Sequence, residues 1–161
     1  MAREYARYLT STHRDDDWRQ LTSLQHDVYM ALSNCEDITW VGVVPYAPAR
    51  FVGYSADLVS EKKVERTWLD LASRGYLVID KPAGELLVRT FVKHDNVIAK
   101  PNLTKALVAA YEKVRSSLIT NAIDCELIKI FGAHPDLAGW RVIEERLPEL
   151  FRELFREPFE G

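Results

Sequence analysis

The sequence contains few of the features that cross-link, anchor or target a chain. Only two of its 161 residues are cysteines, Cys35 and Cys125. They are far apart and lack metal-ligand spacing, which predicts core thiols rather than a disulfide or a catalytic pair. No segment has the pattern of a signal peptide, and no apolar run is long enough to cross a bilayer. We therefore expect a cytoplasmic protein that does not bind membranes.

The motifs that usually mark enzymes are also missing. The sequence has no phosphate loop, no zinc motif, no glycine-rich dinucleotide fingerprint and no hydrolase elbow. The acidic run 15–17 lacks further oxygen ligands for a metal, and His94 and Asp95 lack a nucleophile beside them. We expect no catalytic activity, no metal and no cofactor.

The charge is small but unevenly distributed. The formal net charge is −3, with 21 Lys and Arg against 24 Asp and Glu. Residues 1–49 carry 4 basic and 7 acidic side chains, residues 50–115 carry 12 and 8, and residues 116–161 carry 5 and 9. The positive centre predicts a local patch for an anionic partner such as DNA, between two acidic ends.

The central residues predict the element order of a winged helix-turn-helix. Pro48–Tyr54 is expected to form a short helix, residues 56–59 a turn, and Ser60–Arg74 a longer helix. Two strands, 76–80 and 85–92, follow around a turn containing Pro82 and Gly84. A strand over Ile38–Val44 would complete a three-stranded sheet, after an amphipathic helix that Thr22 caps and that reaches about Asn34.

Local signals support the longer central helix. Ser60 can accept a hydrogen bond from the amide of Lys63, and Gly75 can take the left-handed conformation that ends many helices. One apolar stripe recurs at helical spacing; its members are Val64, Trp68, Leu71 and Ala72.

The remaining segments predict further helices. Met1–Thr12 is expected to form a short strand or an extended arm. Helices are expected over 103–115, after Ser116 as their cap, and from Trp140 onward. We expect an α+β, mostly helical fold with a winged helix-turn-helix domain over 1–115 and a C-terminal helical extension over 116–161. A terminal apolar stripe either packs on the domain or forms an interaction surface; it consists of Leu147, Leu150, Phe151, Leu154 and Phe155.

Several segments also resemble a known group of proteins. They are residues 21–29, 42–46, 64–76, 87–95 and 100–102. Over about residues 15–115 the chain resembles the small winged-helix proteins of actinobacterial phages and prophages. More distantly it resembles the N-terminal domains of phage replisome organisers and of DnaD-type primosome proteins. The resemblance implies a winged-helix fold and a role in DNA replication initiation.

We expect double-stranded DNA to be the partner, with the Ser60–Arg74 helix in the major groove. The candidate DNA-contacting residues are Ser60, Lys62, Lys63, Arg66, Thr67, Lys81, Arg89, Lys93 and Lys100. Such a module usually works as a dimer, so a homodimer or a replication or transcription protein is a further expected partner. Two alternatives remain open: a transcriptional regulator with the same module, and a protein-interaction module that does not bind DNA.

Overall fold

The computed structural model describes residues 9–155, so most of the predicted N-terminal strand or arm lies outside the described residues. The described chain begins with a 3-10 helix, η1 (Thr10–Arg14), followed by α1 (Asp16–Arg19) and α2 (Ser23–Ser33). The Asp15 carboxylate caps α1, and Thr22 and Gln25 form a reciprocal capping box at the start of α2. The predicted cap at Thr22 is therefore confirmed.

The next elements are β1 (Val43–Pro45), η2 (Pro48–Phe51), α3 (Glu61–Ser73), β2 (Leu77–Asp80) and β3 (Glu85–Val88). The three strands form one antiparallel sheet in the order β1-β3-β2. The predicted three-stranded sheet is confirmed, with shorter strands than expected: β1 begins at Val43 rather than Ile38, and β3 ends at Val88 rather than Val92.

The helix expected over Pro48–Tyr54 is a single 3-10 turn that ends at Phe51. Gly53 has a φ of +83°, and its amide donates to the carbonyl of Leu58, so the chain leaves the helix and closes a loop instead. The connection from η2 to α3 is therefore longer than the four-residue turn that the sequence indicated.

The C-terminal half is helical. Its elements are α4 (Phe91–Asp95), η3 (Val97–Ala99), α5 (Pro101–Tyr111), α6 (Ser117–Ala133), α7 (Trp140–Arg146) and α8 (Pro148–Phe155). Ser116 caps α6 as predicted, because its hydroxyl accepts from the amide of Ile119. The α4 helix replaces the end of a predicted strand, and α5 starts and stops earlier than the predicted 103–115 helix.

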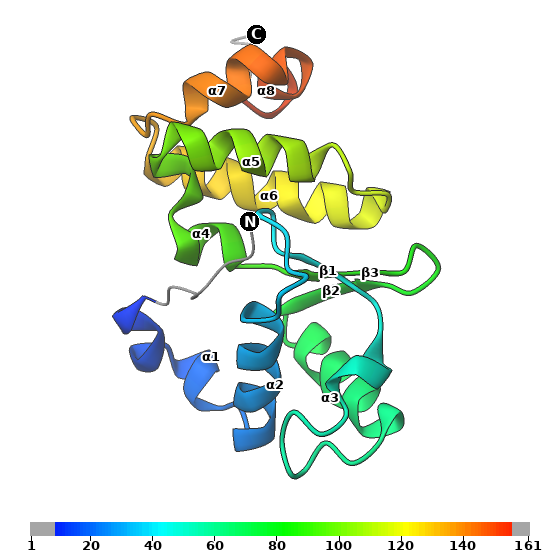
Figure 1. The fold of residues 1–161 in the computed structure, drawn as a ribbon. Helices are drawn as coiled ribbons and strands as arrows, with labels where there is room; N and C mark the ends of the chain where they lie inside the picture. The colour runs from blue at the N-terminus through cyan, green and yellow to red at the C-terminus, as the bar shows by residue number, and fades with distance from the viewer. Residues whose placement is uncertain (1–8, 156–161) are drawn as a thin grey trace, which may run out of the picture.

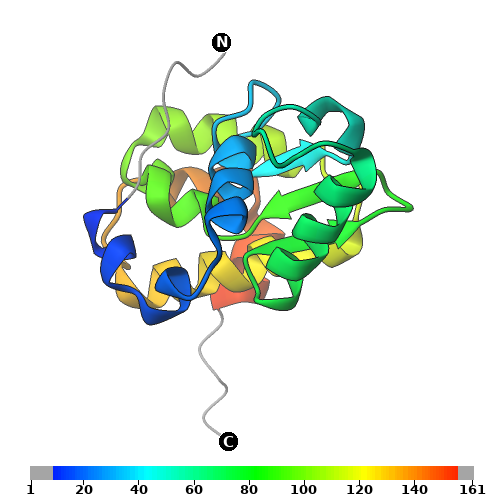
Figure 2. The ribbon, with the colours of Figure 1, turned by 90° about the horizontal axis from the view of Figure 1, so that it is seen from below.

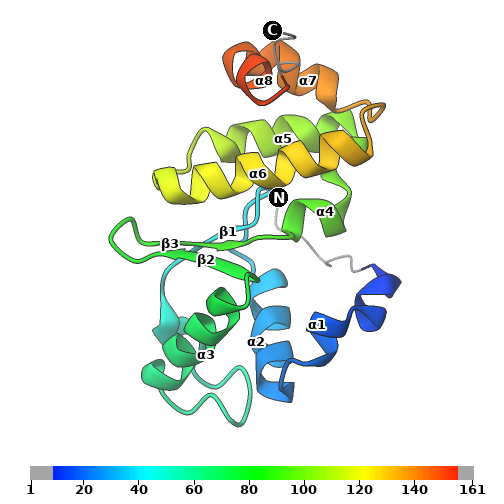
Figure 3. The ribbon, with the colours of Figure 1, turned by 180° about the vertical axis from the view of Figure 1, so that it is seen from behind.

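The sheet lies between two layers of helices. In Figures 1 and 3, α2 and α3 lie on one side of it, and α5 and α6 lie on the other. Viewed from below in Figure 2, the helices surround the strands. All four residues of β3 are buried, including the neighbours Leu86 and Leu87, whose side chains point to opposite faces of the sheet. One continuous core joins both layers, which confirms an α+β, mostly helical fold.

The two cysteines differ in exposure. Both thiols are free, Cys35 is half-buried against the core, and Cys125 is exposed on α6. The prediction of a core thiol is therefore wrong for Cys125, because position 125 faces away from the buried stripe of Ile119, Ile123 and Leu127.

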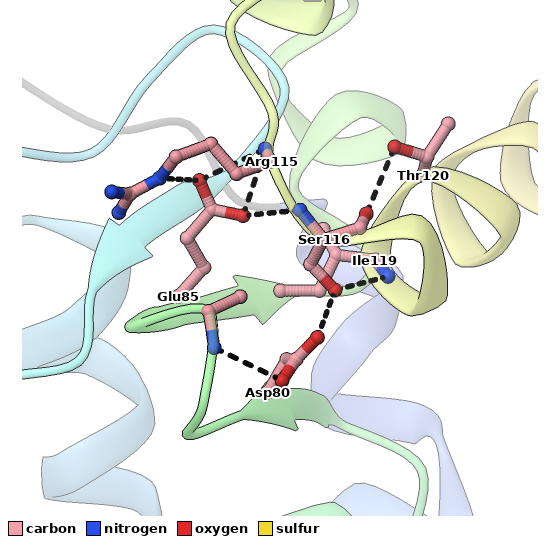
Figure 4. A network of polar contacts seen from close by, with 7 residues as sticks. Asp80, Glu85, Arg115, Ser116, Ile119 and Thr120 are labelled. Atoms are coloured by element: carbon pink, nitrogen blue, oxygen red, sulfur yellow. Dashed lines mark hydrogen bonds and ion pairs between the residues drawn. The ribbon is translucent and has the colours of Figure 1, made fainter.

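The β2–β3 hairpin is fastened to the start of α6 by a polar network (Figure 4). The buried carboxylate of Glu85 accepts from the amides of Arg115 and Ser116, at 3.2 and 3.0 Å. The Ser116 hydroxyl donates to Asp80 at 2.6 Å, and the other oxygen of Asp80 accepts from the amide of Ala83 in the hairpin turn. The hairpin and the helical layer above it are therefore joined through hydrogen bonds as well as through the core.

Candidate nucleic-acid interface

The α3 helix is amphipathic, and residues at its two ends fix where it starts and stops. The Ser60 hydroxyl accepts from the amide of Lys63 at 3.2 Å, and Gly75 follows the helix with a φ of +82°, so both predicted end signals are confirmed. Val64, Trp68 and Leu71 are fully buried, which confirms the predicted apolar stripe.

The opposite face of α3 points to solvent. Lys62, Arg66, Leu69 and Ser73 follow one another at helical spacing on this face and are all exposed, with Lys63 beside them. Within the part of the chain that the structure describes, no ion pair involves Lys62, Lys63 or Arg66. We call these three exposed cations the α3 basic face.

The tip of the hairpin is held next to this face. The Glu65 carboxylate accepts from the hydroxyl of Tyr46 at 2.7 Å and from the ammonium of Lys81 at 3.1 Å. Burial and the hydrogen bond to Glu65 raise the pKa of Tyr46 to about 12, whereas the bonds from Tyr46 and Lys81 lower the pKa of Glu65. Lys81 therefore lies beside α3 as a DNA contact requires, but Glu65 already neutralises part of its charge.

Thr67 is not available to contact a partner. Its side chain is only 4% exposed, and its hydroxyl donates to the carbonyl of Lys63 one turn earlier at 2.8 Å. The prediction that Thr67 assists DNA contacts is wrong, because position 67 lies on the buried side of the helix, between Val64 and Leu71.

Arg89 connects elements of the protein to one another. Its Nε donates to Oε1 of Glu126 on α6 at 2.8 Å, and its Nη1 donates to the carbonyl of Gly75 at the end of α3. The predicted phosphate contact at Arg89 needs correction, since the guanidinium is held by a buried carboxylate. The sequence alone did not indicate this contact, because Glu126 lies on α6, 37 residues further along the chain.

Lys93 and Lys100 are exposed, as a phosphate contact requires, but they are not near α3. Lys93 belongs to α4 and Lys100 immediately precedes α5; in Figures 1 and 3, α5 lies on the other side of the sheet from α3, and α4 lies beyond the end of the strands. The structure thus brings together Ser60, Lys62, Lys63, Arg66 and Lys81, and separates them from these two lysines.

The terminal apolar stripe packs on the rest of the protein. The ring of Phe155 lies 4.1 Å from that of Phe131 on α6 and 5.4 Å from that of Trp140 on α7, measured between centroids. Leu147, Phe151 and Leu154 also contact the core. Of the two interpretations offered by the sequence, packing against the domain is therefore the arrangement that the structure contains.

Two features of the surface were not anticipated. Leu69 is 61% exposed in the middle of the outward face of α3, a position that its spacing from Lys62 and Arg66 could have indicated. A cavity also lies between α4, η3 and the second half of α6, and its walls come from segments too distant in sequence to be grouped beforehand.

The search for metal and membrane sites covered residues 9–155. No group of three metal-ligating side chains occurs among them, and none of the described helices combines the length and apolarity needed to span a bilayer. Comparison of the chain with protein-family models, with curated proteins and with solved structures found no significant match.

Proposed function

We propose that the chain is a winged-helix DNA-binding protein in which α3 enters the major groove and the β2–β3 hairpin is the wing. The order of α2, β1, η2, α3 and the hairpin supports this proposal, because a winged helix has the same succession of elements. The sheet order β1-β3-β2 supports it too, since the hairpin then projects beside α3.

The observation that carries the proposal is the α3 basic face. Lys62, Lys63 and Arg66 lie in the first half of α3, where residues of a recognition helix meet base edges and phosphates. An arginine can donate two hydrogen bonds to guanine, and a lysine can pair with a phosphate. Ser60 lies at the start of the same helix, and Lys81 lies beside it at the wing tip.

Within this function, initiation of replication or a related phage DNA transaction is the proposed role. The resemblance to phage winged-helix proteins and to primosome domains supports that role. Transcriptional regulation is the alternative, since the same module serves it. A homodimer would present two α3 helices to the duplex and double the contacts.

The test is fluorescence anisotropy of a labelled random duplex, titrated with the protein from low to physiological salt. Because each cation at a phosphate releases about one counterion, the α3 basic face should give a slope of roughly −3 per protomer in a plot of log K against log salt. Lys62→Glu with Lys63→Glu should abolish binding without unfolding the protein. Lys105→Glu with Lys113→Glu makes the same charge change away from α3 and should leave most of the affinity. Unchanged affinity in the first double variant would refute the assignment of α3.

A protein-interaction module is the second candidate, and exposed apolar side chains near α3 favour it. Leu69, Val59 and Tyr54 are 61%, 75% and 59% exposed. Apolar side chains that cluster on a surface often mark a protein partner. Binding through them would persist at high salt, whereas DNA binding through the basic face would not.

A further inference from the structure

A cavity of about 520 Å³ lies between α4, η3 and the second half of α6. Leu9, just before η1, and the loop that follows α6 complete its walls. Cavities of about 300–1,000 Å³ are the usual size of sites for small organic ligands. The cavity is therefore large enough for a molecule well beyond a water or an inorganic ion.

The chain turns sharply at the wall of the cavity. Asn96 has a φ of +53°, in the left-handed region, and directs the chain from α4 into the separate turn η3. Asn96 itself lines the cavity, together with Lys93 and His94 of α4 and Ile98 of η3.

One part of the wall is apolar. Val92, Ile98 and Ile130 contribute buried side chains, and Leu137 from the loop after α6 adds to the same lining. Such a surface favours an apolar ligand body through the burial of hydrocarbon from water.

The charged part of the wall is positive. Lys93 and Lys129 both line the cavity, and Glu126 is the one acidic residue among the lining side chains that the structure describes. Oε1 of Glu126 already accepts from Lys129 at 2.9 Å and from Arg89 at 2.8 Å. Burial raises the pKa of Glu126, but these hydrogen bonds outweigh it and lower the pKa overall, so the carboxylate stays ionised and paired. An ammonium has three donors, so Lys129 keeps donors for a second acceptor.

We infer that this cavity is a binding site for an amphipathic organic carboxylate. The apolar body lies against Val92, Ile98 and Ile130, and the carboxylate lies between the ammonium groups of Lys93 and Lys129. This site is separate from the α3 basic face, and its occupation does not depend on DNA binding.

The site also has a short connection to α3. Glu126, at the cavity wall, holds Arg89, and Arg89 donates to the carbonyl of Gly75, the residue that ends α3. Because Lys129 keeps donors for a second acceptor, a bound carboxylate leaves the contacts of Arg89 with Glu126 and Gly75 in place.

The experiment is isothermal titration calorimetry of the full chain, without DNA, using sodium octanoate, octylamine and octanol as probes. The three probes share an eight-carbon chain and differ in the charge of the head group. Octanoate should bind at one saturable site, at least about 10-fold more tightly than octylamine, because only the carboxylate matches the two lysines. Octanol should bind more weakly than octanoate because its head group carries no charge.

Two sets of variants locate the site. The double variant Lys93→Gln with Lys129→Gln should bind octanoate about 10-fold more weakly. The control variant Lys105→Gln with Lys113→Gln removes two exposed lysines elsewhere and should keep the wild-type affinity. Ala133→Trp places an indole in the cavity and should abolish binding, whereas Ala109→Trp on the exposed side of α5 should not.

Absence of saturable octanoate binding by the folded protein would overturn the site. Equal binding of octylamine, or an unchanged affinity in the Lys93/Lys129 variant, would overturn the assignment of a carboxylate. Unchanged affinity in Ala133→Trp would overturn the location. Because no DNA is present, none of these outcomes bears on the DNA-binding function.

Discussion

Removing the charge of Glu85 should destabilise the protein more than any ordinary surface substitution. The carboxylate is buried and accepts from two backbone amides, those of Arg115 and Ser116, where the hairpin meets α6 (Figure 4). In Glu85→Gln the amide oxygen can take the place of Oε2, which accepts from both backbone amides, and the NH₂ then replaces Oε1, where the N–H and Nε of Arg115 donate. The buried NH₂ then meets donors in place of an acceptor, and both amides lose a charged acceptor.

The size of the effect follows from these contacts. A buried donor without an acceptor costs about 1–3 kcal/mol, and hydrogen bonds to a charged group are worth about 1.5–3 kcal/mol. The pair between Glu85 and the largely exposed Arg115 side chain adds no more than about 1 kcal/mol. We expect a loss of about 2–4 kcal/mol, which lowers the melting temperature by roughly 5–15 °C for a chain of this length.

The assay is urea unfolding followed by circular dichroism, with Glu112→Gln as the matched control. Glu112 is exposed at the end of α5, and the same substitution there should change the free energy of unfolding by less than about 0.5 kcal/mol. The m-value should not change. If Glu85→Gln and Glu112→Gln were equally stable, the hairpin network would contribute nothing to stability, and the reasoning would be refuted.

Two further perturbations test other parts of the structure. Burial raises the pKa of Asp124, and the hydrogen bond from Tyr111 lowers it only in part, so the folded state prefers the protonated acid and loses stability as pH rises through that pKa. Asp124→Asn should therefore be at least as stable as the wild type at pH 7, with a gain that disappears near pH 3; a gain that grows on acidification would contradict this sign. Phe155→Ala removes a ring from the cluster with Phe131 and Trp140 and should cost about 2 kcal/mol in urea unfolding. Leu150→Ala on the same helix should cost less than half as much, and equal costs would show that Phe155 is not a packing residue.

The parts of the fold that the sequence predicts well are those fixed by neighbouring residues. The caps at Thr22, Ser60 and Ser116 need only a side chain and an amide three residues later, and Gly75 needs only its own conformational freedom. The stripe of α3 is likewise local, because helical spacing determines which residues share a face. These elements lie where expected.

The parts that were mispredicted depend on distant residues. Arg89 looked like a surface cation because its partner, Glu126, is 37 residues further along the chain. The helix at Pro48 ends early because Gly53 bonds to Leu58 across a loop, and nothing in the helical pattern marks that contact. Thr67 was predicted to assist DNA contacts, although its position between Val64 and Leu71 assigns it to the core.

In the candidate sites, too, local features could be predicted from the sequence and features built from distant segments could not. The α3 basic face follows from one helix and could be predicted, whereas the cavity needs α4, η3 and α6 to be placed relative to one another. Leu69 was overlooked because an apolar residue outside the stripe carries no charge signal, although it stands between two outward positions, Arg66 and Ser73.

The contacts at Glu85 also constrain the order in which the protein forms as it is synthesised. Glu85 in the hairpin accepts from the amides of Arg115 and Ser116, which lie 30 and 31 residues further along the chain. The α6 helix that follows them ends only at Ala133. While those residues are still inside the ribosome, the emerged β3 strand has one face without cover, and the Glu85 carboxylate has only water as a donor. Closure of so long a loop delays the contact. The hairpin beside α3 therefore matures late, after the start of α6 has emerged, although both of its strands precede α6 in the chain.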